Sequence, residues 1–348
     1  MRIYIDIAHP AYAHAFRHFI GEMEKRDHQI LVSARDKDIT QCLLKSWDID
    51  FIDRGKGAAS LTGKVSCLAG TTMRLLPLVR KFNPDLVMSW SSYHAAAIGR
   101  IMGTPVITFE DTEDVPLLHK VNRLLSTNII TPACFEKDLG ASHIRFNGYK
   151  ELASLHPSRF APPPLPPDVD QPFILLRFVS WGAYHDKGHP GISEKMKHYI
   201  AEKLSNFGRV YISSEDPLTP GLYKYRAPVD CITMHSLLAG ASLFFGESAS
   251  MAAEAAVLGV PSIYIDNAGR GYTRELENDY GLMFNFGEDE DSVYDAIKKA
   301  VELLKSGGIQ KEWQQKRRKM LEDKIDTTAY MVELAENINR GIMPGQQS

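Results

Sequence analysis

The sequence predicts an α/β protein made of two doubly wound, Rossmann-like domains that face a cleft. Short apolar runs alternate with helical segments of ten or more residues, which is typical of βαβ units around a parallel sheet. A proline-rich segment interrupts this alternation, and the alternation begins again after it. The length of 348 residues also suits two domains of about 150 residues each.

The first half of the chain alternates strands and helices from its second residue onward. The predicted strands are Arg2–Ile7, Gln29–Ser33, Asp50–Asp53, Asp85–Trp90, Pro105–Phe109, Asn128–Thr131 and Ile144–Phe146. The predicted helices between them are Ala13–Lys25, Asp38–Ser46, Gly63–Phe82, His94–Met102 and Leu117–Leu125. This order predicts one parallel sheet for a first domain of residues 1–160.

Prolines mark the domain boundary. Six of them crowd residues 157–167, and such a segment is stiff and extended, so we place the linker at 161–172. The second domain, 173–325, has predicted strands at Phe173–Phe178, Arg209–Ser213, Leu243–Gly246, Ser262–Ile265 and Leu282–Phe286. The C-terminal helices are predicted at Asp291–Lys305, Ile309–Leu321 and Thr327–Asn339. We expect residues 326–348 to pack back on the first domain.

Composition and charge argue against several functional classes. A formal net charge of -3 gives no electrostatic footprint for nucleic acid, so DNA or RNA is not expected as a partner. The four cysteines show neither a CxxC pair nor the spacing of zinc ligands. No signal-peptide core precedes the first strand, and no apolar run reaches the roughly 18 residues of a membrane helix. We expect a cytoplasmic protein without a transmembrane segment, and a peripheral position at the inner membrane face stays open.

The stretch Leu243–Asp266 carries the strongest functional signal. It predicts a buried strand, a turn of small residues, an alanine-rich helix and a second buried strand. A strand that leads into a helix in this way leaves backbone N–H groups unpaired at the helix start, where an anion binds. With Ser248 as N-cap, Glu254 lies too deep for a capping box and shares a helix face with Ser250. A diphosphate at the helix start with a ribose one turn further would meet both.

This element and the tandem of domains resemble the GT-B glycosyltransferase superfamily. Two similar branches are the MurG-type N-acetylglucosaminyl transferases and the non-hydrolysing UDP-GlcNAc 2-epimerases. The opening Asp6–Pro10, the strand end at Arg177 and the segment Glu254–Ala256 resemble the uncharacterised domain of unknown function 354 family. The resemblance implies that Glu254 accepts the ribose hydroxyls. It also implies that the turn and helix start Ser248, Ala249, Ser250 and Met251 face the diphosphate. The alternative is a surface Glu254 and a Ser248 that only caps the helix.

Two further loops are candidates for donor contacts. The resemblance implies that the loop after the second domain's first strand touches the donor phosphates, and the planar, permanently charged guanidinium of Arg177 suits a diphosphate. Ser180 is a helper at the same place, and a surface salt bridge is the alternative for Arg177. The loop after Ser262–Ile265 contacts the donor sugar in GT-B transferases, which makes Arg270 a candidate.

The first domain offers three candidate catalytic groups. The MurG branch holds a histidine at the first domain's opening turn, and both His14 and His9 match it because the alignment is loose by one residue. Histidine is the natural general base near neutral pH. Glu110 opens an acidic segment where the epimerases hold a cleft glutamate, and close carboxylates raise one another's pKa. The alternative for each histidine is a structural role inside the helix or at its cap. The alternative for Glu110 is a place in a solvated acidic loop.

We expect a metal-independent glycosyltransferase that uses a nucleoside-diphosphate sugar, with UDP as the expected nucleotide. The acceptor is unidentified, and lipid-linked and glycan-linked molecules both stay open. No cofactor beyond the sugar nucleotide and no metal is expected. The epimerase branch has an aspartate after the strand that matches Asp85–Trp90, and this chain has none in Ser89–His94, so transfer ranks above epimerisation. An epimerase-like enzyme, a nucleotide-sugar hydrolase and a non-catalytic nucleotide-sugar binder are the alternatives.

Helix Gly63–Phe82 mixes leucines and valines with Lys64, Arg74, Arg80 and Lys81. We favour a helix that packs its apolar face on the core. The alternative is a membrane-surface patch for a lipid-linked acceptor.

Overall fold

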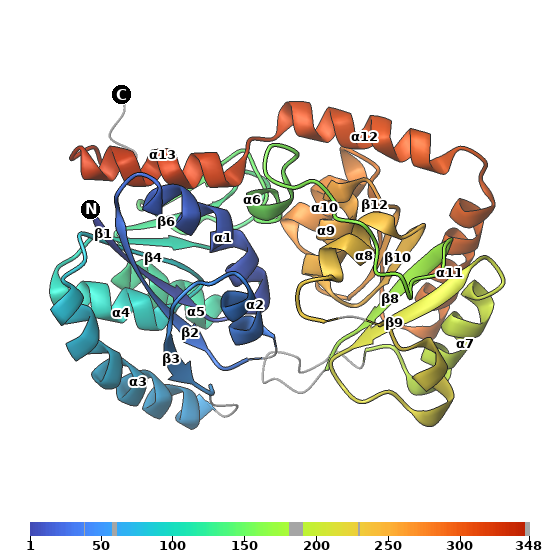
Figure 1. Ribbon diagram of the computed structural model, residues 1–348, viewed down its shortest axis with the longest axis horizontal. Coiled ribbons are helices and arrows are strands. Elements are labelled where there is room, and N and C mark those ends of the chain that lie inside the picture. The colour runs from blue at the N-terminus through green and yellow to red at the C-terminus, as the bar shows by residue number, and fades with distance from the viewer. Residues whose placement is uncertain (38, 58–60, 181–190, 229, 345–348) are drawn as a thin grey trace. The chain divides into compact units, whose positions relative to one another are not determined.

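The computed structural model describes residues 1–37, 39–57, 61–180, 191–228 and 230–344, and the side chains of residues 61–67 lie outside this description. The chain divides into two compact units, which are described separately (Figure 1). Unit 1 comprises Met1–Arg159 and Lys324–Ser348, and unit 2 comprises Phe160–Asp323. The proline-rich segment 161–172 is therefore part of unit 2.

The described strands of unit 1 form a seven-stranded parallel sheet in the order β3-β2-β1-β4-β5-β6-β7. They are β1 Arg2–Ile7, β2 Gln29–Arg35, β3 Ile52–Gly55, β4 Leu86–Trp90, β5 Val106–Phe109, β6 Asn128–Pro132 and β7 His143–Phe146. The chain first adds strands on one side of β1 and then returns to add them on the other. This reversal between β1 and β4 defines a doubly wound sheet.

Helices cover both faces of this sheet (Figure 1). On one face α3 contacts α4 and α4 contacts α5, while α1 contacts α2, α6 and α13 on the other face. The bounds are α1 Pro10–Glu24, α2 Thr40–Ser46, α3 Leu61–Phe82, α4 Tyr93–Met102, α5 Pro116–Leu125, α6 Leu152–Leu155 and α13 Thr327–Asn339. Because right-handed crossovers are the rule for parallel strands, connections that run in opposite directions from β1 are expected to cover both faces.

Helix α1 begins three residues before the predicted start at Ala13. His9 serves as its N-cap, because its extended backbone lets Nδ1 accept a hydrogen bond from the Ala11 N–H at 3.2 Å. Pro10 follows at the first helical position, where a missing N–H costs nothing. A histidine cap followed by proline is an unusual start signal, which explains why the prediction was late.

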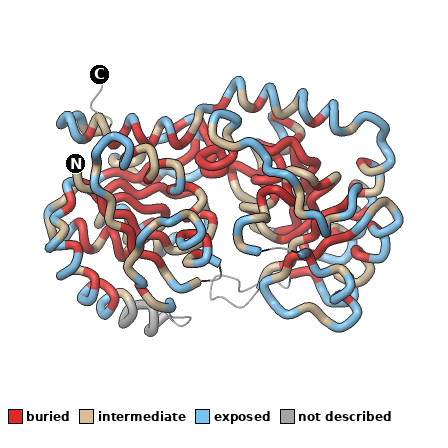
Figure 2. The backbone as a smooth tube through the Cα atoms, in the orientation of Figure 1, coloured by how far each residue is buried: buried red, intermediate tan, exposed pale blue. Residues whose placement is uncertain are grey.

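The core of unit 1 lies on both sides of its sheet, as the buried strands in Figure 2 show. On the α3 side, Leu75 and Val79 pack with Tyr4 and Val87. The favoured interpretation of this helix, a core-facing one, is confirmed for these positions. Leu78 on the same helix is exposed, so part of its apolar surface does not reach the core.

Unit 2 contains a five-stranded parallel sheet in the order β12-β11-β10-β8-β9. Its strands are β8 Phe173–Phe178, β9 Arg209–Ser214, β10 Leu243–Gly246, β11 Ser262–Ile265 and β12 Met283–Phe286. Its helices are α7 Glu194–Leu204, α8 Met234–Gly240, α9 Ala249–Leu258, α10 Gly271–Asn278, α11 Glu290–Lys305 and α12 Ile309–Asp323, with a short 3-10 helix at Pro220–Tyr225. The strand order reverses between β8 and β10. The predicted α/β class with two doubly wound parallel sheets is confirmed.

Gly246 ends β10 at a close approach between the backbones of β8 and β10. It pairs in register with Arg177, and a Cβ at this position would lie 2.3 Å from the Arg177 carbonyl oxygen. Only glycine fits such a backbone contact. The glycine therefore brings the turn after β10 directly beside the end of β8.

Within the described part of the chain, none of the helices combines the length and apolar character needed to cross a bilayer.

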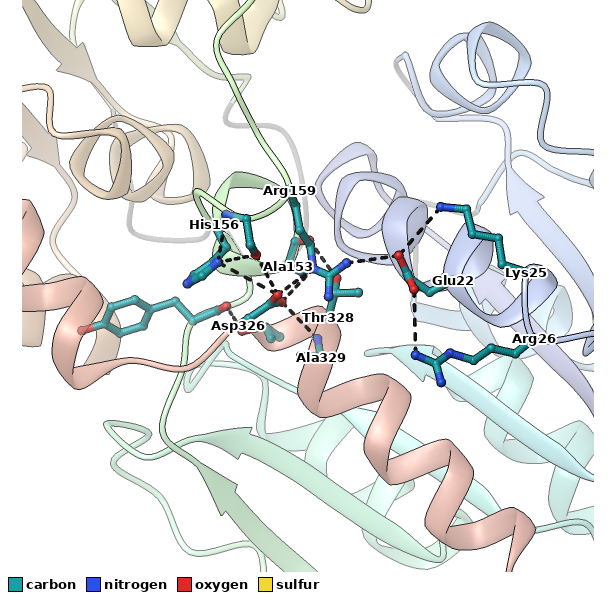
Figure 3. Close-up of polar contacts among 12 residues, drawn as sticks. Glu22, Lys25, Arg26, Ala153, His156, Arg159, Asp326, Thr328 and Ala329 are labelled. Carbon is teal, nitrogen blue, oxygen red and sulfur yellow. Dashed lines mark hydrogen bonds and ion pairs between the residues drawn. The ribbon is translucent and has the colours of Figure 1, made fainter.

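A polar cluster holds the C-terminal helix α13 on unit 1 (Figure 3). The Arg159 Nε donates to both carboxylate oxygens of Asp326, at 2.9 and 2.7 Å, and Asp326 caps α13 by accepting from the Ala329 N–H at 3.0 Å. On its other side Arg159 lies 3.6 Å from Glu22 of α1. One largely buried guanidinium therefore joins α1 to the start of α13.

Replacing Asp326 by Asn is expected to lower the free energy of unfolding by about 2 kcal/mol at pH 7, because Arg159 then loses its charged partner in a largely buried position. Burial alone would raise the pKa of Asp326, but hydrogen bonds from Arg159, Ala329 and Ser158 hold it below its usual value. A carboxyl group whose pKa is lower in the folded than in the unfolded state stabilises the fold fully at pH values above its ordinary pKa. That stabilisation is lost as the pH falls through the pKa of the folded state.

Urea unfolding at pH 7 and below pH 3 measures the difference in free energy of unfolding between wild type and Asp326→Asn. This difference should be smaller below pH 3. Asp85→Asn is the control, since its 3.8 Å pair with Arg2 is exposed and is expected to contribute less than about 1 kcal/mol. Equal losses in the two variants would contradict the assignment.

Candidate functional site

Each sheet has one place where ligands are expected. In doubly wound sheets ligands bind beyond the carboxyl ends of the strands, at the point where the strand order reverses. In unit 2 this point lies between the ends of β8 and β10, and in unit 1 between the ends of β1 and β4. The predicted site residues therefore separate into one group in each unit.

Helix α9 begins at the switch point of unit 2. Ser248 is its N-cap, with extended backbone, and its Oγ accepts from the Met251 N–H at 3.4 Å. The N–H groups of Ala249 and Ser250 lie in the first turn, where the helix itself supplies no acceptor. The structure thus places Ser248, Ala249, Ser250 and Met251 where a helix dipole and first-turn amides attract an anion.

Glu254 lies in the second turn of α9 and is 6% exposed. The alternative of a surface carboxylate is therefore wrong. Its Oε1 lies 3.4 Å from Nε2 of His235, which belongs to α8 and is also buried. The sequence did not single out His235, because the pair joins two helices and has no local motif.

Arg177 is already engaged at the end of β8. Its Nη1 donates to Ser213 Oγ at 2.8 Å and its Nη2 to Glu215 Oε1 at 2.7 Å. Glu215 also accepts from the backbone N–H of Ser180, at 3.2 Å. A phosphate at this position would have to share Arg177 with Glu215. The Arg177 side chain is 18% exposed and is therefore not fully enclosed.

Two buried carboxylates that the sequence did not single out organise the same edge. Glu247 accepts from the N–H of Val179 at 3.1 Å and from that of Ile192 at 2.6 Å. Glu288, after β12, accepts from the N–H of Gly191 at 3.2 Å and from that of Asn267 at 3.3 Å. These bonds tie together segments that follow β8, β10, β11 and β12. The only local signal for Glu247 was its place between Gly246 and the N-cap.

Arg270 is the N-cap residue of α10, after β11. Its N–H donates to Thr273 Oγ1 at 3.1 Å, and the same hydroxyl donates to the Arg270 carbonyl at 3.0 Å. The backbone of Arg270 is thus fixed and its side chain is half-buried. It lies at the carboxyl edge of the same sheet as Ser248 and Arg177.

Glu110 follows β5 in unit 1 and is 1% exposed. Its Oε1 accepts from the N–H groups of Asp111 and Thr112, both at 3.1 Å. Burial, together with the nearby Asp111 charge, raises the pKa of Glu110 to about 8. The carboxyl group therefore carries a proton at neutral pH and can donate it.

The acidic segment around Glu110 is not a solvated loop, since Glu110, Asp111 and Glu113 are buried. Asp111 forms an ion pair with Lys150, whose Nζ also lies 3.2 Å from Glu151. Among the residues the structure describes, no three His, Cys, Asp or Glu side chains are placed to hold a metal ion.

Tyr12 connects this cluster to the start of α1. Its ring stacks on Trp90 at 6.3 Å, and the Lys150 Nζ lies 6.0 Å from its centroid. The His9 ring is 5.6 Å from the Tyr12 ring. The structure therefore brings His9 to the margin of the Glu110 cluster.

His14 has different surroundings. It meets the Trp47 ring edge-on at 5.0 Å, next to the end of α2, on the β2 side of β1. Glu110 follows β5, on the opposite side of β1 in the sheet order. His9 uses Nδ1 as an acceptor at the helix cap, so its neutral ring carries the proton on Nε2. In this arrangement His9 presents a donor.

The switch point of unit 1 contains a buried polar network that sequence inspection missed. Asp6, at the end of β1, accepts from Arg54, Ser92 and Ser33, with the Ser33 bond at 2.5 Å. Nearby His94 is buried, and burial together with the Arg54 charge lowers its pKa to about 4. Asp6 and Arg54 are 48 residues apart, which is why no local pattern revealed them.

A groove of about 340 Å³ lies elsewhere in unit 1, along α1 and α13. Arg26, Arg159, Glu333 and Arg340 are among the residues that line it, and the predicted site residues are not. Its place between two helices, away from the strand ends, separates it from the candidate site.

Residues 1–161 match the family described as Protein of unknown function (DUF354). A curated relative is Uncharacterized protein MJ0665 of Methanocaldococcus jannaschii, which is 22% identical over 277 residues that cover 75% of this chain and 80% of that protein. The predicted resemblance to this family is confirmed.

Solved structures with the GT-B fold are similar along the whole chain. A Listeria monocytogenes protein assigned as a UDP-N-acetylglucosamine 2-epimerase has a TM-score of 0.70 at 13% identity, covering 98% of this chain and 97% of that one. MnaA of S. aureus, solved with UDP, has a TM-score of 0.70 at 11% identity, covering 100% and 99%. The spinosyn rhamnosyltransferase SpnG, complexed with thymidine diphosphate, has a TM-score of 0.62 at 13% identity, covering 96% and 100%. At these identities the likeness shows the fold.

The raised pKa of Glu110 predicts a pH-dependent stability. Between the ordinary carboxyl pKa and about 8 the folded protein binds a proton that the unfolded chain has lost, so the free energy of unfolding falls as pH rises. The expected slope from this group is about 1.4 kcal/mol per pH unit in that window. Glu110→Gln keeps the carbonyl acceptor and removes the titration. Urea unfolding at pH 5.5 and 7.5 should show a smaller pH loss in Glu110→Gln than in wild type, and equal losses would refute the raised pKa.

Proposed function

We propose that the protein is a glycosyltransferase that takes a sugar from a nucleoside-diphosphate sugar, with UDP as the nucleotide. The observation that carries the proposal is helix α9, which starts at the unit 2 switch point and holds the buried Glu254 one turn further in. A helix start binds a diphosphate and a carboxylate binds vicinal hydroxyls, so their spacing suits a nucleotide with its ribose. The similar folds solved with UDP and thymidine diphosphate support the same ligand class.

The donor half of the proposed reaction belongs to unit 2. The first-turn N–H groups of α9 stabilise the charge that develops on the diphosphate as the bond from the sugar C1 to its oxygen breaks. His235 orients the Glu254 carboxylate toward the ribose hydroxyls. Arg177 adds a fixed positive charge beside the phosphates, and Arg270 contacts the sugar.

Unit 1 supplies the proton chemistry. As the acceptor oxygen forms its bond to C1, its hydroxyl proton passes to a base. Glu110 accepts that proton in its ionised form, and with a pKa of about 8 this form becomes more abundant as pH rises toward 8. His9 and His14 are the other two candidate bases. His9 needs a change of tautomer for this role, because its Nδ1 is occupied at the helix cap.

A nucleotide-sugar epimerase is the second candidate function. A protonated, buried carboxyl group such as Glu110 suits a reaction that removes and returns a proton, and the Listeria monocytogenes structure supports this class. Incubation with UDP-GlcNAc alone, followed by NMR, separates the candidates. UDP-ManNAc would identify an epimerase and free sugar a hydrolase, whereas transfer requires an added acceptor.

Glu254→Gln and Glu254→Ala are expected to weaken UDP binding about 10- to 100-fold, because each removes charge-assisted hydrogen bonds to the ribose. Isothermal titration calorimetry with UDP measures the dissociation constant, and Glu302→Gln on the exposed surface of α11 is the control. Thermal unfolding verifies that the variants fold. Unchanged affinity in both Glu254 variants would refute the ribose contact.

Arg177→Ala is expected to weaken binding of UDP more than binding of uridine, because uridine lacks the phosphates that the Arg177 charge would attract. If the variant changes the affinities for UDP and uridine equally, or changes neither, then Arg177 only pairs with Glu215 and does not contact the phosphates.

A further inference from the structure

The helical layer formed by α3, α4 and α5 contains no Asp or Glu in its sequence. The same helices carry Arg74, Arg80, Lys81, Arg100, Lys120 and Arg123 among their described side chains. The whole chain has more acidic than basic residues, 43 against 40. Positive charge is thus concentrated on one face of unit 1.

Large apolar side chains are exposed on the same layer. Met73 and Leu124 are 74% and 77% exposed, and Leu78, Ile101 and Leu117 are also exposed. Each helix contributes at least one of them. Leu117 and Leu124 are seven residues apart and therefore lie along one face of α5. A group of exposed apolar side chains on one layer marks an interaction surface.

Five basic side chains of this layer are exposed, whereas the sixth, Arg74, donates to the Arg54 carbonyl. Among the described residues, no carboxylate lies within ion-pair distance of Arg80, Lys81, Arg100, Lys120 or Arg123. They lie close in sequence to the exposed apolar residues: Leu78 precedes Arg80, Ile101 follows Arg100, and Arg123 precedes Leu124. Each of these basic residues thus lies within three positions of an exposed apolar residue on the same helix.

We propose that the outer face of α3, α4 and α5 binds the surface of an anionic lipid bilayer. Lysine and arginine attract anionic headgroups, and their alkyl stems together with exposed leucine, isoleucine and methionine side chains enter the boundary between headgroups and acyl chains. Nucleic acid would use the positive charges but offers no apolar layer for the leucines. This surface is independent of the proposed transferase chemistry, which depends on the strand ends.

Vesicle sedimentation tests the proposal. It compares binding to vesicles of phosphatidylcholine with phosphatidylglycerol and binding to vesicles of phosphatidylcholine alone. Wild type is expected to bind the anionic vesicles at low salt and to dissociate as salt rises. The fourfold variant Arg80→Gln, Lys81→Gln, Lys120→Gln and Arg123→Gln should bind about a thousandfold more weakly, since each lost charge removes about a fivefold contribution to binding. Leu117→Ser with Leu124→Ser should also reduce binding, with the charges kept.

The matched control removes four positive charges from the other helical layer: Lys25→Gln, Arg26→Gln, Lys45→Gln and Arg340→Gln. It should keep the affinity of wild type for vesicles. Unchanged UDP binding and thermal unfolding in the surface variants show that the fold is intact. The proposal is overturned if wild type prefers neither vesicle, or if the control loses as much binding as the surface variant. It is also overturned if the leucine variant binds vesicles like wild type while a duplex oligonucleotide competes for the site.

Discussion

The geometry of the two parallel sheets controls where chemistry can occur in this protein. All strands of a parallel sheet end at the same edge, and the reversal of strand order opens a gap there. Buried carboxylates gather at these edges: Asp6 and Glu110 in unit 1, Glu247 and Glu254 in unit 2. A buried charge without a partner is very costly, so each of these groups needs a compensating interaction.

The four carboxylates obtain that compensation in four ways. Asp6 has the Arg54 guanidinium, and Glu247 receives backbone N–H donors from both sides. Glu254 lies beside His235, and Glu110 retains its proton. The raised pKa of Glu110, about 8, makes this carboxyl group able to exchange a proton near neutral pH. Asp6 is instead held by hydrogen bonds from Arg54, Ser92 and Ser33, which suits a role in fixing the end of β1.

Periodicity and turn residues were enough to predict the elements, because a parallel sheet buries its strands as short continuous apolar runs. Strands such as Phe173–Phe178 and Leu243–Gly246 were predicted with their observed bounds. The N-terminus of α9 was predictable for the same reason, since Ser248 follows a buried strand within a few residues. The start of α1 was not, because its cap is a histidine.

Most partners of the site residues were not predictable from sequence. Lys150 is 39 residues from Asp111, and Glu215 is 38 residues from Arg177. Such pairs depend on which strands become neighbours, and a single sequence contains no local pattern for them. Arg177 illustrates the consequence: its position at a strand end was correct, but its engagement with Glu215 emerges only from the pairing of β8 with β9.

Helix α3 shows why one apolar segment supported two interpretations. Leu75 and Val79, four residues apart, face the core, whereas Met73 and Leu78 point to the outer surface. A helix that only covered a sheet would place polar side chains on its outer face, as α11 does with Glu302 and Lys299. The layer α3 to α5 instead combines leucines with positive charges and contains no acids, and neither core packing nor solubility requires that combination. A core-facing helix and a surface for a charged, apolar partner are therefore two faces of the same element.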